Sequence, residues 1–511
     1  MISLEKIKNL QNQKLGFFRF KKFDEDTYLI TNDVGKYSFL SKEDFWTFLT
    51  WELADSEKIA ELTSKKFLKD DTYEADSAVS FRKKNNFLNF WPTLHIVVTT
   101  LRCNHKCQYC HAAVAPMTAK EMDMTQDTAQ KVVDTIFYTS ALDITIEFQG
   151  WESLVNWDIV KFIVEYAEVK AYHLWKSVTF ALVSNLTLMD DEKFDYIVKH
   201  NIHISTSLDG DEDTHNFNRT FKDGNSFEKV TYWIKKINEK YTVLDAQLPD
   251  VEWKVLRKVW ALLTVTKKTL SRYKEVIDTY VDLWLDAIFL RPLNPYGFAA
   301  AEIEKLGYTD DEFIEYYRKS MDYIIEINKK WKLMRENLSA MYLIKILTDS
   351  DPNYLDERSP CWACIGQVAY NYDGKIYSCD EWRMLARMWD QNFLMADVHT
   401  TSSEKHPWYE TYKSMITSET TKVMVQASTL DGLPWYNDSV YKPYIWVCPI
   451  HSYKTSWNLI PNYSIDHKRK IDYAILDYIF EKIRDPEVKE IFEKWIRWPW
   501  AEQIQSQCDI I

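Results

Sequence analysis

From Leu94 onward, short apolar or β-branched segments alternate with stretches that have the periodicity of an amphipathic helix, and this alternation restricts the possible folds most. We expect strands at residues 94–100, 143–148, 178–184, 203–208, 256–265 and 286–291. Between the first two strands, one helical face is predicted from apolar residues at i, i+3, i+4, i+7 and i+8, namely Ala129, Val132, Val133, Ile136 and Phe137. Strand–helix units in series imply a parallel sheet with right-handed crossovers. The predicted fold class is α/β, a partial (β/α)6 barrel similar to a TIM barrel.

The segments on either side of this barrel have different patterns. Residues 1–90 show short apolar segments and a turn at Asn32–Gly35, followed by helical patterns, which predicts a small α+β module. The barrel is expected over residues 91–305, a helical linker over 306–360, an irregular aromatic-rich domain over 361–470 and a helical region over 471–511. In the last region one helical face is formed by Ile475, Leu476, Ile479, Phe480 and Ile483.

Three cysteines follow the first predicted strand with the spacing C-x3-C-x2-C: Cys103, Cys107 and Cys110. In parallel barrels the loops after the strands carry the functional site. Three thiolates on such a loop suit a [4Fe–4S] cluster and leave its fourth iron open to a small molecule. The alternative is a zinc site, for which His105 or His111 would have to supply the fourth ligand at an unusual spacing.

The cysteine spacing, with Tyr109 directly before the third cysteine, resembles the signature of the radical S-adenosylmethionine (SAM) enzymes. Phe148-Gln-Gly-Trp-Glu-Ser resembles the family's FQGGEP segment, with Trp151 in place of the second glycine and Ser153 in place of the proline. Later strand ends resemble further motifs of the family. The resemblance implies SAM binding by Gln149, Gly150, Glu152, Asn185, Ser207 and Arg219. Taken singly, most of these residues are also ordinary turn formers.

A second cysteine group, Cys361-x2-Cys364 followed by Gly374-x4-Cys379, resembles the opening of a SPASM domain, which binds auxiliary [4Fe–4S] clusters. Residues around Asp373-Gly374 predict a hairpin that delivers Cys379. Tyr436, Ser439 and Ile445 stand where the domain has further cysteines, and Cys448 is retained. The resemblance therefore implies one auxiliary cluster, with four ligands: Cys361, Cys364, Cys379 and Cys448.

Asp380 directly follows Cys379, and in sulfatase-maturing relatives the matching carboxylate is the base that deprotonates the substrate. The alternative is a surface aspartate in a turn. The motifs together look most like the His-Xaa-Ser system radical SAM maturase. This implies a precursor peptide substrate, hydrogen abstraction by a 5′-deoxyadenosyl radical, and an electron donor such as flavodoxin or ferredoxin.

Two alternatives remain open. The first is a catalytically impaired iron–sulfur or precursor-peptide-binding protein of the same fold, which Trp151 and the missing auxiliary ligands favour. The second is a formylglycine-forming enzyme similar to the sulfatase maturases. The chain holds only 10 glycines but 21 tryptophans, and tryptophan stands where the family would have glycine at 151, 362, 382, 389, 446 and 457.

Composition restricts the partners and the compartment. The 511 residues have a formal net charge of −13, which argues against nucleic acid or an anionic membrane as the main partner. No signal-peptide pattern and no apolar stretch of membrane-spanning length are found in the sequence. The cysteines are grouped as metal ligands rather than spread as a disulfide framework, and Cys508 stands apart. We expect a cytoplasmic protein.

Overall fold

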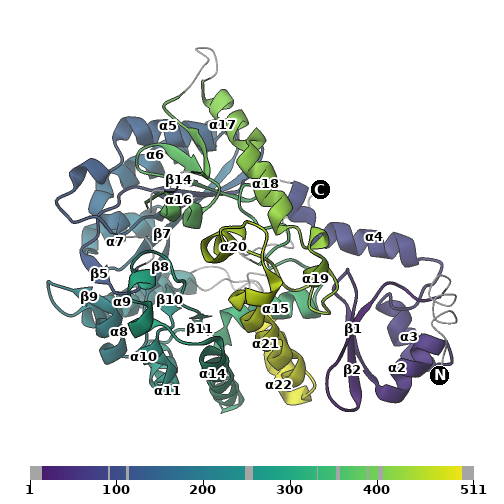
Figure 1. Ribbon diagram of the computed structural model, residues 1–511. Coiled ribbons are helices and arrows are strands. Elements are labelled where there is room, and N and C mark those ends of the chain that lie inside the picture. Colours follow the sequence, from purple (N-terminus) through teal and green to yellow (C-terminus); the bar gives the residue numbers. More distant parts are fainter. Residues whose placement is uncertain are drawn as a thin grey trace.

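The computed structural model describes residues 14–89, 92–110, 114–247, 257–330, 332–352, 357–387, 390, 392–400 and 407–497. His111, Trp389 and Cys508 lie outside these residues. Figure 1 shows the barrel on the left, the N-terminal module at the lower right, and the C-terminal helices between them. Among the described residues, no helix combines the length and the apolarity that a bilayer-spanning helix needs.

The predicted alternation of strands and helices forms one sheet. Its parallel strands are β4 (Leu94–Val98), β6 (Asp143–Gln149), β7 (Ser177–Ser184), β8 (His203–Ser207), β10 (Trp260–Thr264) and β12 (Leu290–Arg291), each hydrogen-bonded to the next. The α/β partial barrel is thereby confirmed. The sixth predicted strand differs in detail, because its first half, β11 (Ala287–Ile288), pairs instead with β13 (Arg335–Glu336).

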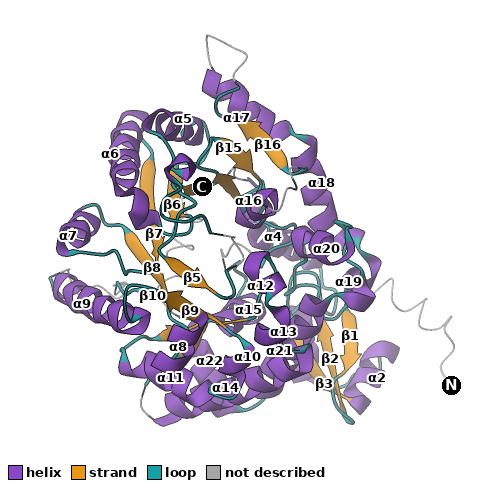
Figure 2. Ribbon diagram, turned by 60° about the vertical axis from the view of Figure 1, so that its left-hand side comes forward, coloured by secondary structure: helices purple, strands orange, loops and turns teal. Residues whose placement is uncertain are grey.

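Helices cover the outer face of this sheet (Figure 2). They are α5 (Gln126–Ile136), α6 (Trp157–Leu174), α7 (Asp191–Lys199), α9 (Ser226–Ala246) and α11 (Tyr273–Asp282). The apolar face predicted for α5 is buried, with Ala129, Val132, Val133 and Ile136 fully inaccessible to solvent. Thr125 caps the helix by accepting a hydrogen bond from the backbone N–H of Thr128. Burial of these apolar side chains against the strands holds the layer in place.

The inner face of the sheet is more polar. Along β6, Ile144, Ile146 and Phe148 are buried under the helices, whereas Thr145, Glu147 and Gln149 alternate with them and are half-buried. The same alternation places Ser205 and Ser207 of β8 on the inner face. Because side chains alternate between the two faces of a strand, these polar residues line the interior of the barrel.

The N-terminal module is an antiparallel sheet of β1 (Arg19–Lys22), β2 (Thr27–Thr31) and β3 (Tyr37–Ser41), followed by α2 (Lys42–Thr50), α3 (Ser56–Ser64) and α4 (Tyr73–Lys84). It has its own small core around Phe45 and Phe48. The module is tied to the C-terminal region by hydrogen bonds from Arg19 to Asn437 and from the Thr31 hydroxyl to the Val440 carbonyl, the latter 2.6 Å long.

The C-terminal half returns to the barrel sheet. After α14 (Asp310–Lys330) and α15 (Asn337–Leu347), strand β14 (Gln367–Tyr370) pairs in parallel with β4, at the edge opposite to β12. The predicted hairpin then forms, with β15 (Lys375–Tyr377) antiparallel to β14 and β16 (Leu394–Asp397) beyond it. The turn needs a left-handed residue, and Gly374 supplies a φ of 83°. The sheet thus continues from the barrel into the region of the second cysteine group.

Helices complete this region: α16 (Asp380–Arg387), α17 (Pro407–Thr417), α18 (Glu419–Ser428), α19 (Pro434–Asn437), α20 (Pro449–Ser456), α21 (His467–Lys482) and α22 (Pro486–Ile496). Helix α21 begins before the boundary expected at residue 471. Its predicted face is buried, since Ile475, Leu476, Ile479, Phe480 and Ile483 are at most 5% exposed. The two last helices pack on α14 and α15 and close the core.

Candidate functional site

Cys103, Cys107 and Cys110 lie in the loop that follows β4, as the sequence predicts. The backbone of this loop is anchored at both ends: the N–H of Cys103 donates to the Ala115 carbonyl at 3.3 Å, and the N–H of Cys110 donates to the Cys107 carbonyl at 3.1 Å. All three thiols are half-buried and none forms a disulfide. Burial, together with the neighbouring thiol Cys110, raises the pKa of Cys107 to about 12. The pKa of Cys103 is raised for the same reason, with Glu152 and both other cysteines contributing.

Two side chains donate hydrogen bonds to these sulfurs. The guanidinium of Arg219 reaches Cys107 Sγ at 3.8 Å, and the amide of Asn185 reaches Cys103 Sγ at 3.9 Å. The Arg219 charge lowers the pKa of Cys107 against the effect of burial. Donors aimed at sulfur stabilise the thiolate form that a metal cluster requires.

The donor set fits an iron–sulfur cluster. It consists of three thiols on one loop, with hydrogen-bond donors beside two of them. Over the described residues, no group of three or more His, Cys, Asp or Glu side chains is arranged to hold a single metal ion. Cysteine thiolates are the usual ligands of such a cluster, so the chemistry of these three side chains fits it.

Arg219 belongs to a small two-stranded ribbon that covers the cysteine loop. Strand β5 (His105–Cys107) pairs antiparallel with β9 (Arg219–Phe221), so that Cys107 lies opposite Arg219 and His105 opposite Phe221. Behind Arg219, Asp209 accepts a hydrogen bond from Arg219 Nε at 3.2 Å and another from the Tyr109 hydroxyl at 2.7 Å. Burial raises the pKa of the Asp209 carboxyl. The sequence motifs predicted that Arg219 binds SAM. They did not indicate that Asp209 holds the Arg219 side chain in place.

The FQG turn after β6 lies against the start of the cysteine loop. Gly150 has a φ of +129°, and a Cβ there would come within 2.7 Å of the Thr100 carbonyl oxygen. Glycine is therefore required at this position. Gln149, on the inner face of the barrel, donates a hydrogen bond to Glu147. Burial raises the pKa of the Glu147 carboxyl, and the nearby charge of Asp380 acts in the same direction.

Glu152 connects the ends of β6 and β7. Its carboxylate is inaccessible to solvent and accepts from the Leu154 N–H at 3.1 Å, the Ser184 hydroxyl at 2.8 Å and the Asn185 N–H at 2.8 Å. Glu152 thus joins the ends of the two strands through hydrogen bonds to protein groups. One of these groups is the backbone of Asn185, whose side chain donates to Cys103 Sγ. Burial raises the pKa of Glu152. The inner-face residue Ser207 lies at the end of β8, opposite Leu262 of β10.

Trp151 is half-buried in a small apolar cluster with Val98, Leu101, Ala115 and Ala119. The guanidinium carbon of Arg383 lies 4.7 Å from the centre of the indole ring. The indole Nε1 is buried without a hydrogen-bond partner. The position of the second glycine in the FQGG segment thus carries a bulky ring that contacts the C-terminal region.

Two of the other predicted auxiliary ligands lie within electrostatic range of Cys379. Burial raises the pKa of the Cys379 thiol, and the charges of Glu381, Cys361 and Cys448 raise it further. The side chain of Cys364 instead contacts Met395, with 3.8 Å between the two sulfurs. Cys364 also has a φ of 67°, in the left-handed region. Three thiols suit a cluster, and Cys364 would have to turn from Met395 to join them.

Asp380 begins helix α16 directly after Cys379 and is only 8% exposed. Arg383, one helical turn later, donates two hydrogen bonds to the same oxygen, Asp380 Oδ1, at 2.8 and 2.6 Å. Asp380 is thus a buried, paired carboxylate rather than a surface residue. The i, i+3 spacing of Asp380 and Arg383 was visible in the sequence and could have indicated this pair.

Comparisons with known proteins agree with this arrangement. Residues 97–245 match the Radical SAM superfamily. The chain is 21% identical over 298 residues to the radical SAM cyclopropyl synthase TigE of Paramaledivibacter caminithermalis, covering 55% of this chain and 56% of that protein. It is 30% identical over 167 residues to an uncharacterized protein of Methanocaldococcus jannaschii, covering 31% of this chain and 55% of that protein. The chain therefore spans little more than half the length of these curated relatives.

Among solved structures, the fold is similar to that of anSMEcpe with bound AdoMet, with a TM-score of 0.60 and 13% identity over 78% of this chain and 99% of that chain. The same protein with AdoMet and the Cp18Cys peptide gives a TM-score of 0.60 and 14% identity over 79% and 99% of the two chains. At this identity the likeness concerns the fold. It confirms the α/β partial barrel.

Proposed function

We propose that the protein is a radical SAM enzyme that modifies a ribosomally made peptide. The observation that carries the proposal is the cysteine loop at the end of β4, with Arg219 donating to Cys107 and Asn185 donating to Cys103. Cys103, Cys107 and Cys110 would hold a [4Fe–4S] cluster whose open iron takes SAM. When bound, the reduced cluster supplies the electron that cleaves SAM.

The chain's own residues prepare this site. Glu152 locks the ends of β6 and β7, so that Asn185 stays in place. Asp209 and Tyr109 hold Arg219 against Cys107. The strand-end residues Gln149, Gly150, Ser207 and Arg219 surround the place where SAM would bind. Burial of the loop excludes water, which protects a reactive species from side reactions.

An auxiliary [4Fe–4S] cluster, held by Cys361, Cys364, Cys379 and Cys448, is part of the proposal. The charges of Cys361 and Cys448 raise the pKa of Cys379, so both thiols lie near it, which supports the proposal. The hairpin that carries Cys379 extends the barrel sheet through β14, so the two cysteine groups are joined by hydrogen-bonded strands. This connection suits electron transfer between the two clusters.

Asp380 is the proposed base for the peptide substrate. Arg383 fixes the carboxylate, and Asp380 lies near Glu147 on the inner face of the barrel. A base that faces the barrel interior can reach a peptide bound there. We expect the substrate to be a precursor with His-Xaa-Ser repeats, which rests on the sequence resemblance alone.

The N-terminal module is the proposed recognition element for the precursor. Phe17 and Phe20 at β1 are 53% and 55% exposed. Strand β1 pairs on one side with β2 and is the edge of its sheet in the described chain. An extended peptide can add to such an edge through main-chain hydrogen bonds.

Anaerobic reconstitution followed by an assay for 5′-deoxyadenosine tests the proposal. We expect about eight irons per chain, because two four-iron clusters need that many, and SAM cleavage on reduction. The matched control is Cys508→Ser, a thiol that the proposal leaves unused, whereas Cys107→Ser should lose about four irons and all SAM cleavage. Stoichiometric zinc in place of iron would refute both clusters.

A second candidate is a precursor-binding protein of the same fold without SAM turnover. The observation that favours it is the Trp151 indole beside the SAM-binding turn. Full iron content without 5′-deoxyadenosine would support it. Formylglycine formation is the third candidate, favoured by Asp380 directly after Cys379, and a cysteine-containing peptide substrate distinguishes it from the first.

A further inference from the structure

The ribbon of β5 and β9 has two different faces. His105, Cys107, Arg219 and Phe221 point inward, and His105 and Arg219 are buried. Lys106 alternates with them and lies opposite Thr220, and Lys222 continues the same outer face beyond the end of β9. Because neighbours on a strand point to opposite faces, lysines stand directly outside the cysteine loop.

More lysines surround this ribbon, held over aromatic rings. The ammonium of Lys229 lies 5.0 Å from the centre of the Phe221 ring, and Phe221 meets His105 edge-on at 4.8 Å. The ammonium of Lys305 lies 5.1 Å from the centre of the Phe217 ring, and Phe217 and Cys107 pack against the same small apolar cluster. Each of these two lysines therefore lies over an aromatic ring that belongs to the surroundings of the cysteine loop.

We name this surface the lysine rim: Lys106, Lys222, Lys229 and Lys305. All four are exposed, and none forms an ion pair with another residue in the described ranges. The neighbouring Lys268 is neutralised by Asp213 at 2.8 Å, and Asp223 and Glu228 lie beside the rim in sequence. A cationic surface is unusual for a chain of net charge −13. Unpaired ammonium groups remain available to an anionic partner.

We propose that the lysine rim is the docking surface for a small acidic protein that carries single electrons, with a flavin or iron–sulfur centre. This inference rests on the proposed function. One electron leaves the reduced carrier and enters the cluster at Cys103, Cys107 and Cys110, so the carrier is oxidised by one electron and the cluster is reduced by one. Opposite charges would speed the encounter, and a small contact area suits a partner that must leave again.

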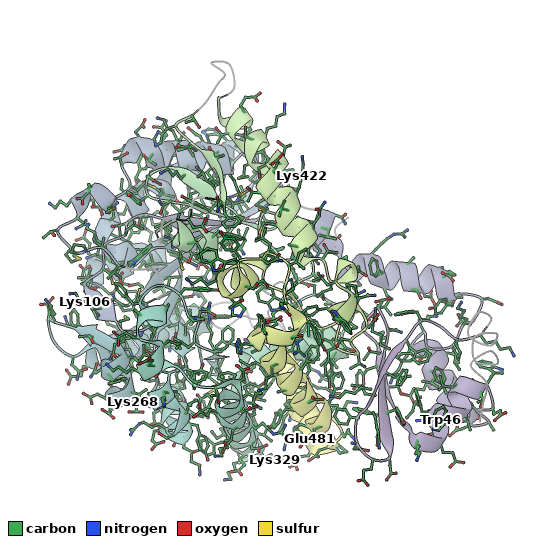
Figure 3. All side chains as sticks on the ribbon, in the orientation of Figure 1. Trp46, Lys106, Lys268, Lys329, Lys422 and Glu481 are labelled. Atoms are coloured by element: carbon green, nitrogen blue, oxygen red, sulfur yellow. The ribbon has the colours of Figure 1, made fainter. Side chains whose placement is uncertain are left out.

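The test uses the reconstituted full-length chain and a reduced flavodoxin with an acidic face. Two double variants are compared, Lys106→Glu with Lys222→Glu and Lys229→Glu with Lys305→Glu. The control is Lys422→Glu, since Lys422 is also exposed and lies on α18, on the opposite side of the molecule from Lys106 (Figure 3). Binding is measured by calorimetry, and cluster reduction by stopped-flow absorbance at several salt concentrations.

We expect reduction of the unaltered protein by the carrier to slow steeply with added salt, because exposed charges are screened. Each double variant should be reduced on the order of ten-fold more slowly and lose most of this salt dependence. Equal rates and equal binding for all proteins would overturn the docking surface. Failure of the unaltered protein to cleave SAM after full reduction by dithionite would instead contradict the proposed function, so the two failures are distinguishable.

A second, independent observation concerns tryptophan. Eight non-glycine residues of the described chain have a positive φ, and four of them are tryptophans: Trp51, Trp175, Trp284 and Trp457, with φ between 54° and 62°. This left-handed region is rare for bulky residues. The backbone of all four follows the end of a helix.

These positions are ordinary glycine positions. Trp51, Trp175 and Trp457 are the C-caps of α2, α6 and α20, and the cap N–H of Trp457 donates to the Tyr453 carbonyl at 2.7 Å. Left-handed helix ends of this kind usually carry glycine, because a Cβ is unfavourable there. Every helix C-cap in the described chain that is left-handed carries tryptophan instead.

Packing gives no reason for an indole at these sites. Trp175, Trp457 and Trp284 are 92%, 77% and 73% exposed. By contrast, Trp495 is fully buried in the core, and its indole Nε1 donates a hydrogen bond to Asn328 at 3.3 Å. The chain therefore holds two kinds of tryptophan. In one kind the indole fills space in the core, and in the other the indole is exposed at a residue with left-handed backbone. Trp151 is half-buried, but it stands at the second glycine of the FQGG-like turn, and we group it with the second kind for that reason.

We infer that the natural polypeptide carries glycine at positions 51, 151, 175, 284 and 457. Its gene would specify these positions by a codon that the source organism reads as glycine, and the buried position 495 by the ordinary tryptophan codon. The first test is to read the codons of the gene at these positions, and the second is to measure the masses of peptides from the protein isolated from its own source. The inference would be overturned if positions 175 and 495 had the same codon, or if the peptide from the native protein carried tryptophan at 175.

Thermal unfolding of the recombinant chain gives a further readout. Trp175→Gly and Trp457→Gly should each raise the melting temperature by roughly 1–3 °C, because the left-handed strain is removed. The control Trp495→Gly should lower it strongly by emptying a core site. A loss of stability on Trp175→Gly as large as that on Trp495→Gly would contradict the assignment of 175 as a glycine position.

Discussion

The guanidinium of Arg383 lies over the indole of Trp151, 4.7 Å from the ring centre, while the same guanidinium holds Asp380. The turn after β6, where SAM would bind, is thereby in contact with the helix that begins beside Cys379. A cation over an aromatic face is attracted by about 0.5–2 kcal/mol, depending on its exposure. The residue at position 151 consequently affects both the SAM-binding turn and the orientation of the proposed base.

Trp151→Gly is expected to strengthen SAM binding by roughly ten-fold or more, which corresponds to about 1.4 kcal/mol, because the indole no longer crowds the turn. Isothermal titration of the reconstituted protein with SAM measures this directly. Trp175→Gly is the control, since Trp175 is a surface residue at the end of α6. Equal SAM affinity for the original and the Trp151→Gly protein would show that the indole does not obstruct SAM.

Glu152→Gln is expected to destabilise the fold by about 1–3 kcal/mol. The buried carboxylate accepts three hydrogen bonds, and an amide nitrogen placed among these donors leaves at least one of them without an acceptor. Urea unfolding followed by circular dichroism gives the change in midpoint. Glu147→Gln, on the preceding strand β6, is the control, because Glu147 accepts from the Gln149 side chain and its own pKa is already raised by burial. A midpoint for Glu152→Gln no lower than that for Glu147→Gln would contradict the structural role.

The barrel could be predicted from the sequence because its signal is local. Each strand has a short apolar segment and each helix an apolar face, as Val132 and Ile136 illustrate. The extension of the sheet through β14 could not be predicted. Strands β4 and β14 are separated by more than half the chain, and no local pattern specifies which buried strands become neighbours.

The site was predicted in part for the same reason. Spacing alone placed Cys103, Cys107 and Cys110 together on one loop, because they are close in the sequence. The partners that fix the site come from distant segments: Asp209 behind Arg219, and Ser184 beside Glu152. The orientation of Cys364 toward Met395 depends on a left-handed backbone that its sequence neighbours do not indicate.

His95 is expected to make the protein less stable in mild acid. This core residue of β4 contacts the Pro92 carbonyl at 3.0 Å and the Tyr370 hydroxyl at 3.2 Å, and burial lowers its pKa from 6.5 to about 3. The unfolded chain binds a proton below about pH 6.5, whereas the folded chain does not until about pH 3. Stability is therefore complete above this window and falls as the pH drops, by about 2 kcal/mol at about pH 5.

Urea midpoints measured between about pH 7 and pH 5 check this expectation. The variant His95→Gln, which keeps a polar side chain but does not titrate, should show a shallower loss of stability with acid. His215 is also buried and has a lowered pKa for that reason, and it contributes equally to both proteins. If the urea midpoints of the two proteins fall by the same amount between about pH 7 and pH 5, His95 is excluded as a source of acid sensitivity.

The auxiliary cluster can be tested one thiol at a time. Cys379→Ser is expected to lower the iron content from about eight to about four per chain, because Cys361 and Cys448 lie near Cys379. Cys364→Ser should have the same effect if Cys364 turns from Met395 to complete the ligand set. Iron analysis with electron paramagnetic resonance of the reduced protein separates the two clusters. A Cys364→Ser protein that retains about eight irons would mean that three thiols and a non-cysteine group hold the auxiliary cluster.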